Sequence, residues 1–364
     1  MKNYQFDTKA IHAAQSPDIA THSRTAPIYQ TTAYTFESVE FAKDLFELKE
    51  NGDIYTRITN PTNAILEGRL AALDDGVGAV AFASGHAAMT ACISNLASCG
   101  DEIVSSINIY GGAINLFGIT FKNYGINFKF VDPANFDEWE KAITSKTKAL
   151  FAEAVGNPNA DVADIEKLAQ IAHKHNIPLI IDSTFTTPYL QKAFDFGADI
   201  VIHSATKFLG GHGTSMAGIV VDSGKFNFKN NDKFPQYNTP DQSYHGLVFA
   251  DIPNGAGFIT RLKTLILRDL GACLSPFNAF MILQGIETLS LRMQRHCQNA
   301  LAVAEFLEKH PRVKKVNYPS LESSPYYTLS KKYLPKGCGG VFTFEIYLKI
   351  EQGPEINIKI KLFS

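Results

Sequence analysis

The chain has 364 residues, of which 45% are hydrophobic and 19% are charged, and its formal net charge is −2. This is the balance of an ordinary globular protein long enough for two domains. The small net charge, without a Lys/Arg block, argues against nucleic acid or a polybasic membrane surface as a partner. No apolar run reaches the about 18 residues of a membrane-spanning helix. Five scattered cysteines without CxxC spacing argue against a disulfide framework or a zinc site and favour the cytoplasm.

The first clear element is a helix that starts at Asn60-Pro61, where asparagine suits the N-cap and proline the first turn. Gly76 is the expected stop. The apolar face of this helix consists of residues at helical spacing, namely Ile65, Leu66, Leu70 and Leu73.

Short apolar runs then alternate with helical patterns. The predicted strands are 79–83, 102–105, 128–131, 149–154, 178–182, 199–203 and 218–221. Because these runs lack polar alternation and are separated by helices, they predict a mostly parallel sheet that is buried on both faces. The fold class is therefore α/β.

Residues 223–255 interrupt this pattern, being rich in Asn, Asp, Lys, Phe and Pro. They read as a long irregular insertion, a kind of segment that is usually functional or disordered. Helical sequence resumes at 259–270 and again from 276 to about 310, where a second, smaller α+β unit should begin.

Lys207 lies just after the apolar run 200–203, among small and apolar residues. If it is buried there, its amine loses charge readily and can form an imine. A lysine that extends to the surface is the alternative, and it is the commoner case for a lone lysine. Ser204 and Thr206 shift the balance, because their hydroxyls can bind the phosphate of an aldehyde partner of Lys207.

Two further motifs support a ligand site. Asp182 ends an apolar strand and could merely cap the next segment. At the carboxyl edge of a parallel sheet, however, it would face the ligand crevice and pair with a pyridinium nitrogen. In the segment 81–88 a strand turns through Ser84-Gly85 into a helix, whose free amides form an anion site. No GxGxxG follows a strand, which argues against a dinucleotide fold.

With these motifs together, the chain resembles the Cys/Met-metabolism enzymes that depend on pyridoxal 5'-phosphate (PLP), from about residue 5 to 345. The resemblance implies an aspartate-aminotransferase-like large domain (PLP fold type I) and a smaller, incomplete C-terminal α+β domain. It further implies an N-terminal arm at 1–58, a cofactor domain at 59–255 and a C-terminal part at 256–364.

The same resemblance implies a role for each residue of the site. Lys207 is the Schiff-base lysine, and Asp182 holds the pyridine nitrogen. Tyr110 stacks on the ring and serves in proton transfer, with Asn157 near the ring and Thr184 as support. The phosphate is held by Gly85, His86, Ser204 and Thr206.

Tyr55 and Arg57 match the family segment that reaches into the phosphate site of a neighbouring subunit. From the residues alone, a Tyr-x-Arg pair ahead of a helix could equally bind an anion or only pack. The resemblance implies active sites shared between subunits, in a homotetramer built from dimers.

The branch of the family is indicated by the insertion, by residues 268–280 and by residues 284–296, which resemble O-acetylhomoserine sulfhydrylases. Methionine γ-lyases carry a cysteine where this chain has Gly112. The implied reaction is γ-replacement of O-acetyl-L-homoserine by sulfide or methanethiol, giving homocysteine or methionine and acetate. The alternatives are γ-elimination, and a chain that binds PLP without turnover. The sequence leaves the acetyl or succinyl ester and the acceptor open.

The last residues depart from the family pattern after Ile346, and no arginine follows Arg312 to clamp a substrate carboxylate. A truncated, locally altered ending is one hypothesis. A genuine strand at 355–360, with period-two alternation, is the other. Elsewhere, His203 and His212 have no third ligand spaced for a metal, and Glu287, Arg292 and His296 suit a structural salt bridge on one helix face.

Overall fold

The computed structural model describes residues 4–347, and its centre is a sheet of seven strands. Each predicted strand is present within two residues of its expected bounds. The strands are β1 (Gly78–Phe82), β2 (Glu102–Ser106), β3 (Asn127–Val131), β4 (Thr147–Glu153), β5 (Leu179–Asp182), β6 (Ile200–His203) and β7 (Gly218–Asp222).

The strand order is β1-β7-β6-β5-β4-β2-β3, and only β7 runs antiparallel to its neighbours. Successive side chains of each strand enter two different apolar cores, as in β5, where Ile181 packs on one face and Ile180 on the other. Burial on both faces explains why the strand sequences show no polar alternation. The prediction of a mostly parallel α/β sheet is confirmed.

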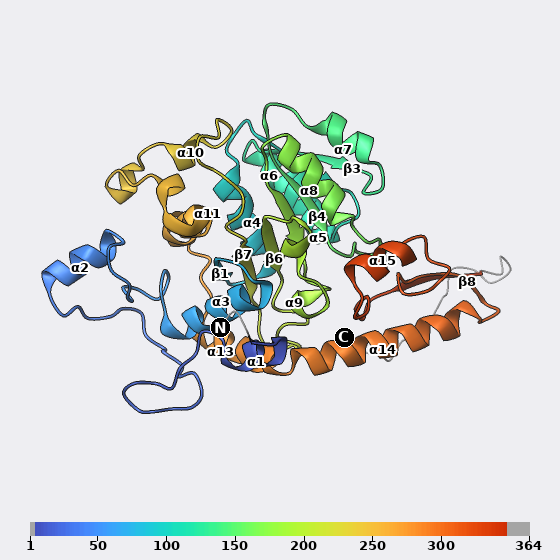
Figure 1. Ribbon diagram of the computed structural model, residues 1–364, viewed down its shortest axis with the longest axis horizontal. Helices are drawn as coiled ribbons and strands as arrows, with labels where there is room; N and C mark the ends of the chain where they lie inside the picture. Colours follow the sequence, from blue (N-terminus) through green and yellow to red (C-terminus); the bar gives the residue numbers. More distant parts are fainter. Residues whose placement is uncertain (1–3, 348–364) are drawn as a thin grey trace.

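Helices cover both faces of this sheet (Figure 1). One core includes residues of α3 and α8, and the other includes residues of α4 and α11. The helices are α1 (Phe6–His12), α2 (Val39–Phe46), α3 (Pro61–Asp74), α4 (Gly85–Leu96), α5 (Gly111–Asn115), α6 (Phe121–Asn123), α7 (Phe136–Ala142), α8 (Ile165–Lys174), α9 (Thr187–Leu190), α10 (Pro235–Asn238), α11 (Gly257–Arg261), α12 (Arg268–Leu270), α13 (Pro276–Glu287), α14 (Leu289–Glu308) and α15 (Tyr327–Tyr333).

Helix α3 begins as predicted, since the Asn60 side chain accepts hydrogen bonds from the amides of Thr62 and Asn63. Its end differs slightly from the prediction. Asp75, with φ 60°, supplies the left-handed residue that closes the helix, and Gly76 follows with its amide bonded to Ala71. An aspartate tolerates this conformation, so the glycine was not needed for it.

The insertion 223–255 is a packed layer in this structure. Phe234, Tyr237 and Phe249 are fully buried, and the Tyr237 hydroxyl donates to the backbone oxygen of Asn95 on α4. The segment contains short helical turns, and the stacking of Phe228 on Phe258 connects it to the core that includes α4 and α11. The expectation of disorder is therefore wrong for this aromatic part of the insertion, which packs against α4.

The C-terminal part forms a smaller unit to one side of the main body (Figure 1). The long helix α14 leads into it, and β8 (Val313–Asn317) pairs antiparallel with β9 (Thr343–Ile346) beside α15. The strand predicted at 355–360 lies outside the described residues. Between residues 4 and 347 no helix is both long and apolar enough to cross a membrane.

Candidate active site

The carboxyl ends of β4, β5 and β6 meet at one edge of the sheet, and each ends on a polar residue. These residues are Glu153, Asp182 and His203. Ligands of open α/β sheets bind at this edge, because the loops that follow the strands open outward there. We call it the carboxyl edge.

Asp182 is 9% exposed, and one of its oxygens accepts a hydrogen bond from the Thr184 amide at 2.9 Å. Burial raises the pKa of this carboxyl, although the hydrogen bonds from Thr184 oppose the shift. The described residues provide no salt-bridge partner for Asp182. A buried carboxylate without a cation is suited to a positively charged ligand group.

Glu153 is a site residue that the sequence analysis missed. It lies opposite Asp182 in the register of β4 and β5, and it accepts hydrogen bonds from the amides of Tyr110 at 2.7 Å and Asn157 at 3.1 Å. Burial, and then the neighbouring Asp182, raise its pKa well above the ordinary value. The available signal was its position, since like Asp182 it ends a buried strand.

Lys207 lies in the turn after β6, and here the expectation of burial is wrong: its side chain is exposed in the single chain. The strand ends at His203, so Lys207 lies beyond the sheet, in the turn at its carboxyl edge. Within residues 4–347 its amine has no hydrogen-bond or ion-pair partner. An imine-forming lysine must nevertheless present a free amine close to the carbonyl group with which it reacts.

The predicted anion site is at the start of α4. The Ser84 side chain caps the helix by accepting from the Ala87 amide, while the amides of Gly85 and His86 have no partner among the described residues. A Cβ on Gly85 would lie 2.8 Å from the Cβ of Ser204. The glycine therefore lets the helix start approach the segment of Ser204 closely, where the Ser204 hydroxyl has no hydrogen-bond partner within the described part of the chain.

The two threonines of the predicted site have structural partners. The Thr184 hydroxyl accepts from the Ser204 amide at 2.8 Å, which fixes the loop after β5 to the loop after β6. The Thr206 hydroxyl donates to the backbone oxygen of Ala217 at 3.1 Å and accepts from its amide. Since a hydroxyl has one proton, Thr206 must release that oxygen before it can donate to a phosphate.

Tyr110 is 49% exposed, and its ring meets the ring of His86 edge to face, with centroids 5.7 Å apart. Gly112 lies directly against both rings. A Cβ at this position would be 2.5 Å from the Tyr110 ring and 3.0 Å from that of His86. Any side chain at 112, including the cysteine of methionine γ-lyases, would force Tyr110 to move.

Tyr55 and Arg57 lie at the end of the N-terminal arm, which Figure 1 shows extending from the body with α2 on it. Tyr55 is 41% exposed. The Arg57 guanidinium lies over the Tyr55 ring, 5.3 Å from its centroid, and donates to the backbone oxygen of Arg268. Both side chains are thus held at the surface of the chain.

Arg292 does not form the expected salt bridge with Glu287, which lies 3.8 Å from Arg69 instead. The Arg292 guanidinium donates instead to the backbone oxygens of Phe208 at 2.7 Å, Leu209 at 3.2 Å and Gly285 at 2.7 Å. The spacing of Arg292 from Glu287 and His296 in the sequence could not show that Arg292 binds these backbone carbonyls. Arg292 therefore fixes the turn that carries Lys207 to the junction of α13 and α14.

His203 is fully buried, and its Nε2 lies 2.9 Å from the Asp74 carboxylate. Burial lowers its pKa, but the Asp74 charge and hydrogen bond outweigh burial and leave the pKa raised. His203 therefore packs and hydrogen-bonds inside the fold. His212 is exposed, with Nδ1 2.6 Å from the backbone oxygen of Gly210.

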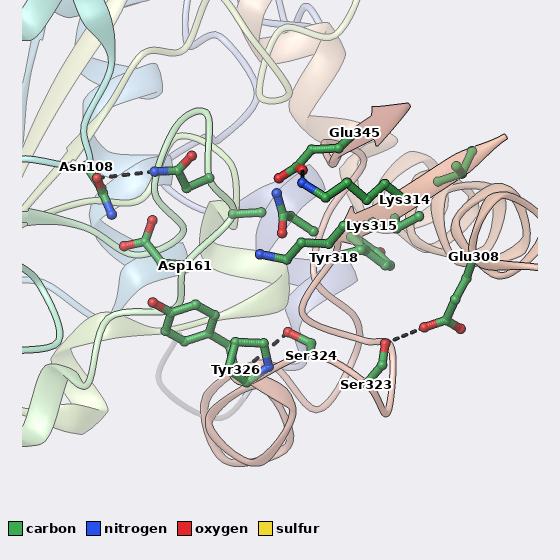
Figure 2. Close-up of a pocket in the computed structure, with 16 residues that line it drawn as sticks. Asn108, Asp161, Glu308, Lys314, Lys315, Tyr318, Ser323, Ser324, Tyr326 and Glu345 are labelled. Atoms are coloured by element: carbon green, nitrogen blue, oxygen red, sulfur yellow. Dashed lines mark hydrogen bonds and ion pairs between the residues drawn. The ribbon is translucent and has the colours of Figure 1, made fainter. Parts of the chain in front are cut away.

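A separate cavity of about 570 Å³ lies between the loop of Asp161 and strand β8 (Figure 2). Burial raises the pKa of Asp161 to about 6. Lys315 and Tyr326 line the cavity from the smaller unit. None of the predicted site residues lines it, so it is distinct from the site around Lys207.

Comparison with known proteins agrees with this geometry. A model of the family described as "Cys/Met metabolism PLP-dependent enzyme" matches residues 7–364. The O-acetyl-L-homoserine sulfhydrylase of Leptospira meyeri is 46% identical over 372 residues, which cover 100% of this chain and 84% of the relative. The homocysteine synthase of Schizosaccharomyces pombe is 45% identical and is covered over 85% of its length.

Among solved structures, an O-acetylhomoserine (thiol)-lyase from Campylobacter jejuni superposes with a TM-score of 0.91 at 44% identity, covering 94% of this chain and 85% of that chain. That structure contains a pyridoxyl-lysine phosphate. A cystathionine γ-lyase from Lactobacillus plantarum gives 0.79 at 31% identity, with coverages of 94% and 79%. The present chain belongs to the PLP-dependent enzymes of Cys/Met metabolism, with the type I fold of that family.

The residues at the carboxyl edge fit the cofactor of this family. PLP presents a phosphate, a ring nitrogen that is basic and an aldehyde. Among residues 4–347 the structure offers a glycine helix start with unpaired amides, a buried carboxylate without a salt-bridge partner, and a lysine amine without a partner. Each part of the cofactor thus has a chemically matched group at one edge of the sheet.

Proposed function

We propose that this chain catalyses γ-replacement on O-acetyl-L-homoserine, with sulfide as acceptor, to give homocysteine and acetate. The observation that carries the proposal is the similarity to sulfhydrylases over the whole chain, joined to the matched groups at the carboxyl edge. In this reading Lys207 binds the cofactor aldehyde covalently and Asp182 pairs with the ring nitrogen. The amides of Gly85 and His86 hold the phosphate together with Ser204 and, after local adjustment, Thr206.

The bound cofactor supplies an electron sink for the substrate α carbon. The residues of the chain then transfer protons and orient the substrate. Once the substrate amine had replaced Lys207 on the cofactor aldehyde, the released Lys207 amine would move protons between the α and β carbons of the substrate. Tyr110 stacks on the ring and assists this transfer, while Asn157 and Thr184 fix the ring's surroundings. Acetate leaves from the γ carbon and sulfide adds there.

γ-Elimination is the competing function, since a cystathionine γ-lyase shares the fold. Gly112 favours replacement. Its lack of a side chain leaves Tyr110 against His86, whereas a cysteine at this position cannot be accommodated without moving that ring.

The same proposal includes an oligomer with shared sites and a cytoplasmic location. Tyr55 and Arg57 are presented on an extended arm, where they would complete the phosphate site of a neighbouring subunit in a tetramer built from dimers. A guanidinium is well suited to a phosphate. Five cysteines without a disulfide accord with a reducing compartment.

The proposal is tested by incubating the PLP-loaded protein with O-acetyl- or O-succinylhomoserine, each with sulfide or methanethiol. We expect homocysteine and acetate in equal amounts from the acetyl ester and sulfide. Production of a keto acid and ammonia in the presence of sulfide would instead establish elimination. A protein that binds PLP but changes neither substrate would contradict both activities.

A further inference from the structure

Glu153 joins two loops that are far apart in sequence. It is the last residue of β4, and one of its carboxylate oxygens accepts from the Tyr110 amide at 2.7 Å while the other accepts from the Asn157 amide at 3.1 Å. Tyr110 lies in the segment after β2, directly before α5, and Asn157 lies in the loop after β4. One side chain therefore fixes the backbone of both segments.

The surroundings of Glu153 make a carboxylate at this position energetically unfavourable. It faces the same side of the sheet as Asp182, because the two residues are paired in register on neighbouring strands. Adjacent side chains on one sheet face have Cβ atoms about 5 Å apart. Two carboxylates at such a distance, one buried and one half-buried, repel each other, and no cation among the described residues compensates Glu153.

A glutamine would accept only one of the two amides and would avoid the repulsion. The carboxylate is the side chain of this size that accepts at both ends simultaneously. The structure thus keeps a costly group at a place where its two-sided acceptor property is used.

We propose that Glu153 is a positioning residue, which sets the spacing between Tyr110 and Asn157 and thereby the geometry of the cofactor ring between them. The inference rests on the ring placement proposed above. Glu153 touches neither substrate nor ring in this scheme; it acts through the two residues whose amides it holds.

The primary experiment compares Glu153→Gln with Asp199→Asn. Asp199 is a matched control at the opposite edge of the same sheet: a buried carboxylate that accepts from the Leu179 amide at 2.8 Å. In Glu153→Gln we expect the dissociation constant of PLP to rise about tenfold, as for loss of one charge-assisted hydrogen bond. We also expect a shifted visible absorption of the bound cofactor, and kcat should fall more than KM rises.

Asp199→Asn should lower thermal stability and leave the cofactor spectrum and affinity unchanged. If the two variants behave alike, Glu153 is only a structural contact and the inference is overturned. A double-mutant cycle adds a second criterion. The effect of Glu153→Gln should shrink in an Asn157→Ala background, because the spacing no longer matters there, and additive effects would contradict the proposal.

Hydrogen exchange on the unmodified protein keeps the inference testable even if Glu153→Gln does not fold. The amides of Tyr110 and Asn157 should be protected to a similar degree before PLP is added. Rapid exchange of either amide would contradict the proposal that Glu153 holds both segments. The two proposals also fail separately. A wild-type protein that binds no PLP refutes the proposed function, whereas equal binding by wild type and Glu153→Gln refutes only the role of Glu153.

Discussion

The two edges of the central sheet treat buried charge differently. At the amino edge, Asp199 accepts from the Leu179 amide and from His173, each at 2.8 Å, and Glu102 lies 2.8 Å from Lys129. At the carboxyl edge, Asp182 and Lys207 have no ionic partner among the described residues. When a fold pairs the charged groups at one edge of a sheet and leaves those at the other edge without partners, the unpaired groups indicate where a ligand binds.

The sharpest test of this contrast replaces one lysine at each edge by alanine. Lys207→Ala should abolish covalent PLP attachment and reduce turnover by about 10³-fold or more, because general acid–base transfer and covalent catalysis are lost together. Lys148→Ala, at the amino edge beside Asp101, should lower the melting temperature and preserve the cofactor spectrum. Absorption spectra and initial rates measure both. Retained covalent attachment in Lys207→Ala would remove Lys207 from its assigned role.

The next largest effect is expected at Asp182. Asp182→Asn removes the charge that would keep the ring nitrogen protonated, so kcat should fall at least about tenfold, equivalent to ~1.4 kcal/mol of barrier. The stability of the cofactor-free protein should not fall, because a buried charge disappears. Steady-state kinetics and thermal melts without PLP test the two statements. A destabilised apoprotein with normal kcat would reverse the contrast between the edges.

Arg292 sharpens the comparison, because it shows that the backbone beneath Lys207 is held firmly while the amine is free. Arg292→Lys should destabilise the protein by about 1–3 kcal/mol, since a point-like ammonium cannot reach three carbonyls. Chemical denaturation measures this loss. An unchanged midpoint would mean that the three hydrogen bonds contribute little to the folded state.

Asp222 is the exception at the amino edge, and the effect that it predicts is confined to stability and depends on pH. One oxygen accepts from the Gly224 amide, but the other is buried without a partner among the described residues, and burial raises the pKa of the carboxyl to about 7. The folded state therefore binds a proton that the unfolded state has released between about pH 4 and 7. Stability falls as the pH rises through this window.

Asp222→Asn should remove that dependence. Relative to wild type, the variant should gain stability at pH 7.5, by at most ~4 kcal/mol, and the gain should vanish near pH 4. Melting curves across this range provide the measurement. A stability difference that is constant with pH would show that Asp222 is ionised throughout.

The sequence predicted the sheet well because buried strands are bounded by abrupt changes in composition. β5 and β6, for example, are continuous apolar runs that end on Asp182 and His203. Contacts between distant segments were beyond the same reasoning. The burial of Phe234 and Tyr237 under α4, the reach of Arg292 and the emergence of Lys207 all depend on packing that local periodicity does not encode.

The assigned roles at the site remain predictions, with different support from the structure. Gly85 and Ser204 lie against each other, as their shared role at the phosphate requires, and Asp182 ends its strand in a buried position. The hydroxyl of Thr206 is engaged elsewhere, which its position in the motif could not reveal. Glu153 escaped because a glutamate at a strand end has many ordinary uses, and only its two amide partners distinguish it.

The strand order has a consequence for how the chain is made. β7, the last strand of the sheet in sequence, lies between β1 and β6. Gly85 follows β1 and Ser204 follows β6, so they can meet only after β7 has been inserted between those strands. A ribosome-bound chain shorter than about 222 residues therefore has no assembled anion site. Acquisition of PLP would report that this middle strand is in place, which makes the cofactor's colour a natural probe of the late, long-range step of folding.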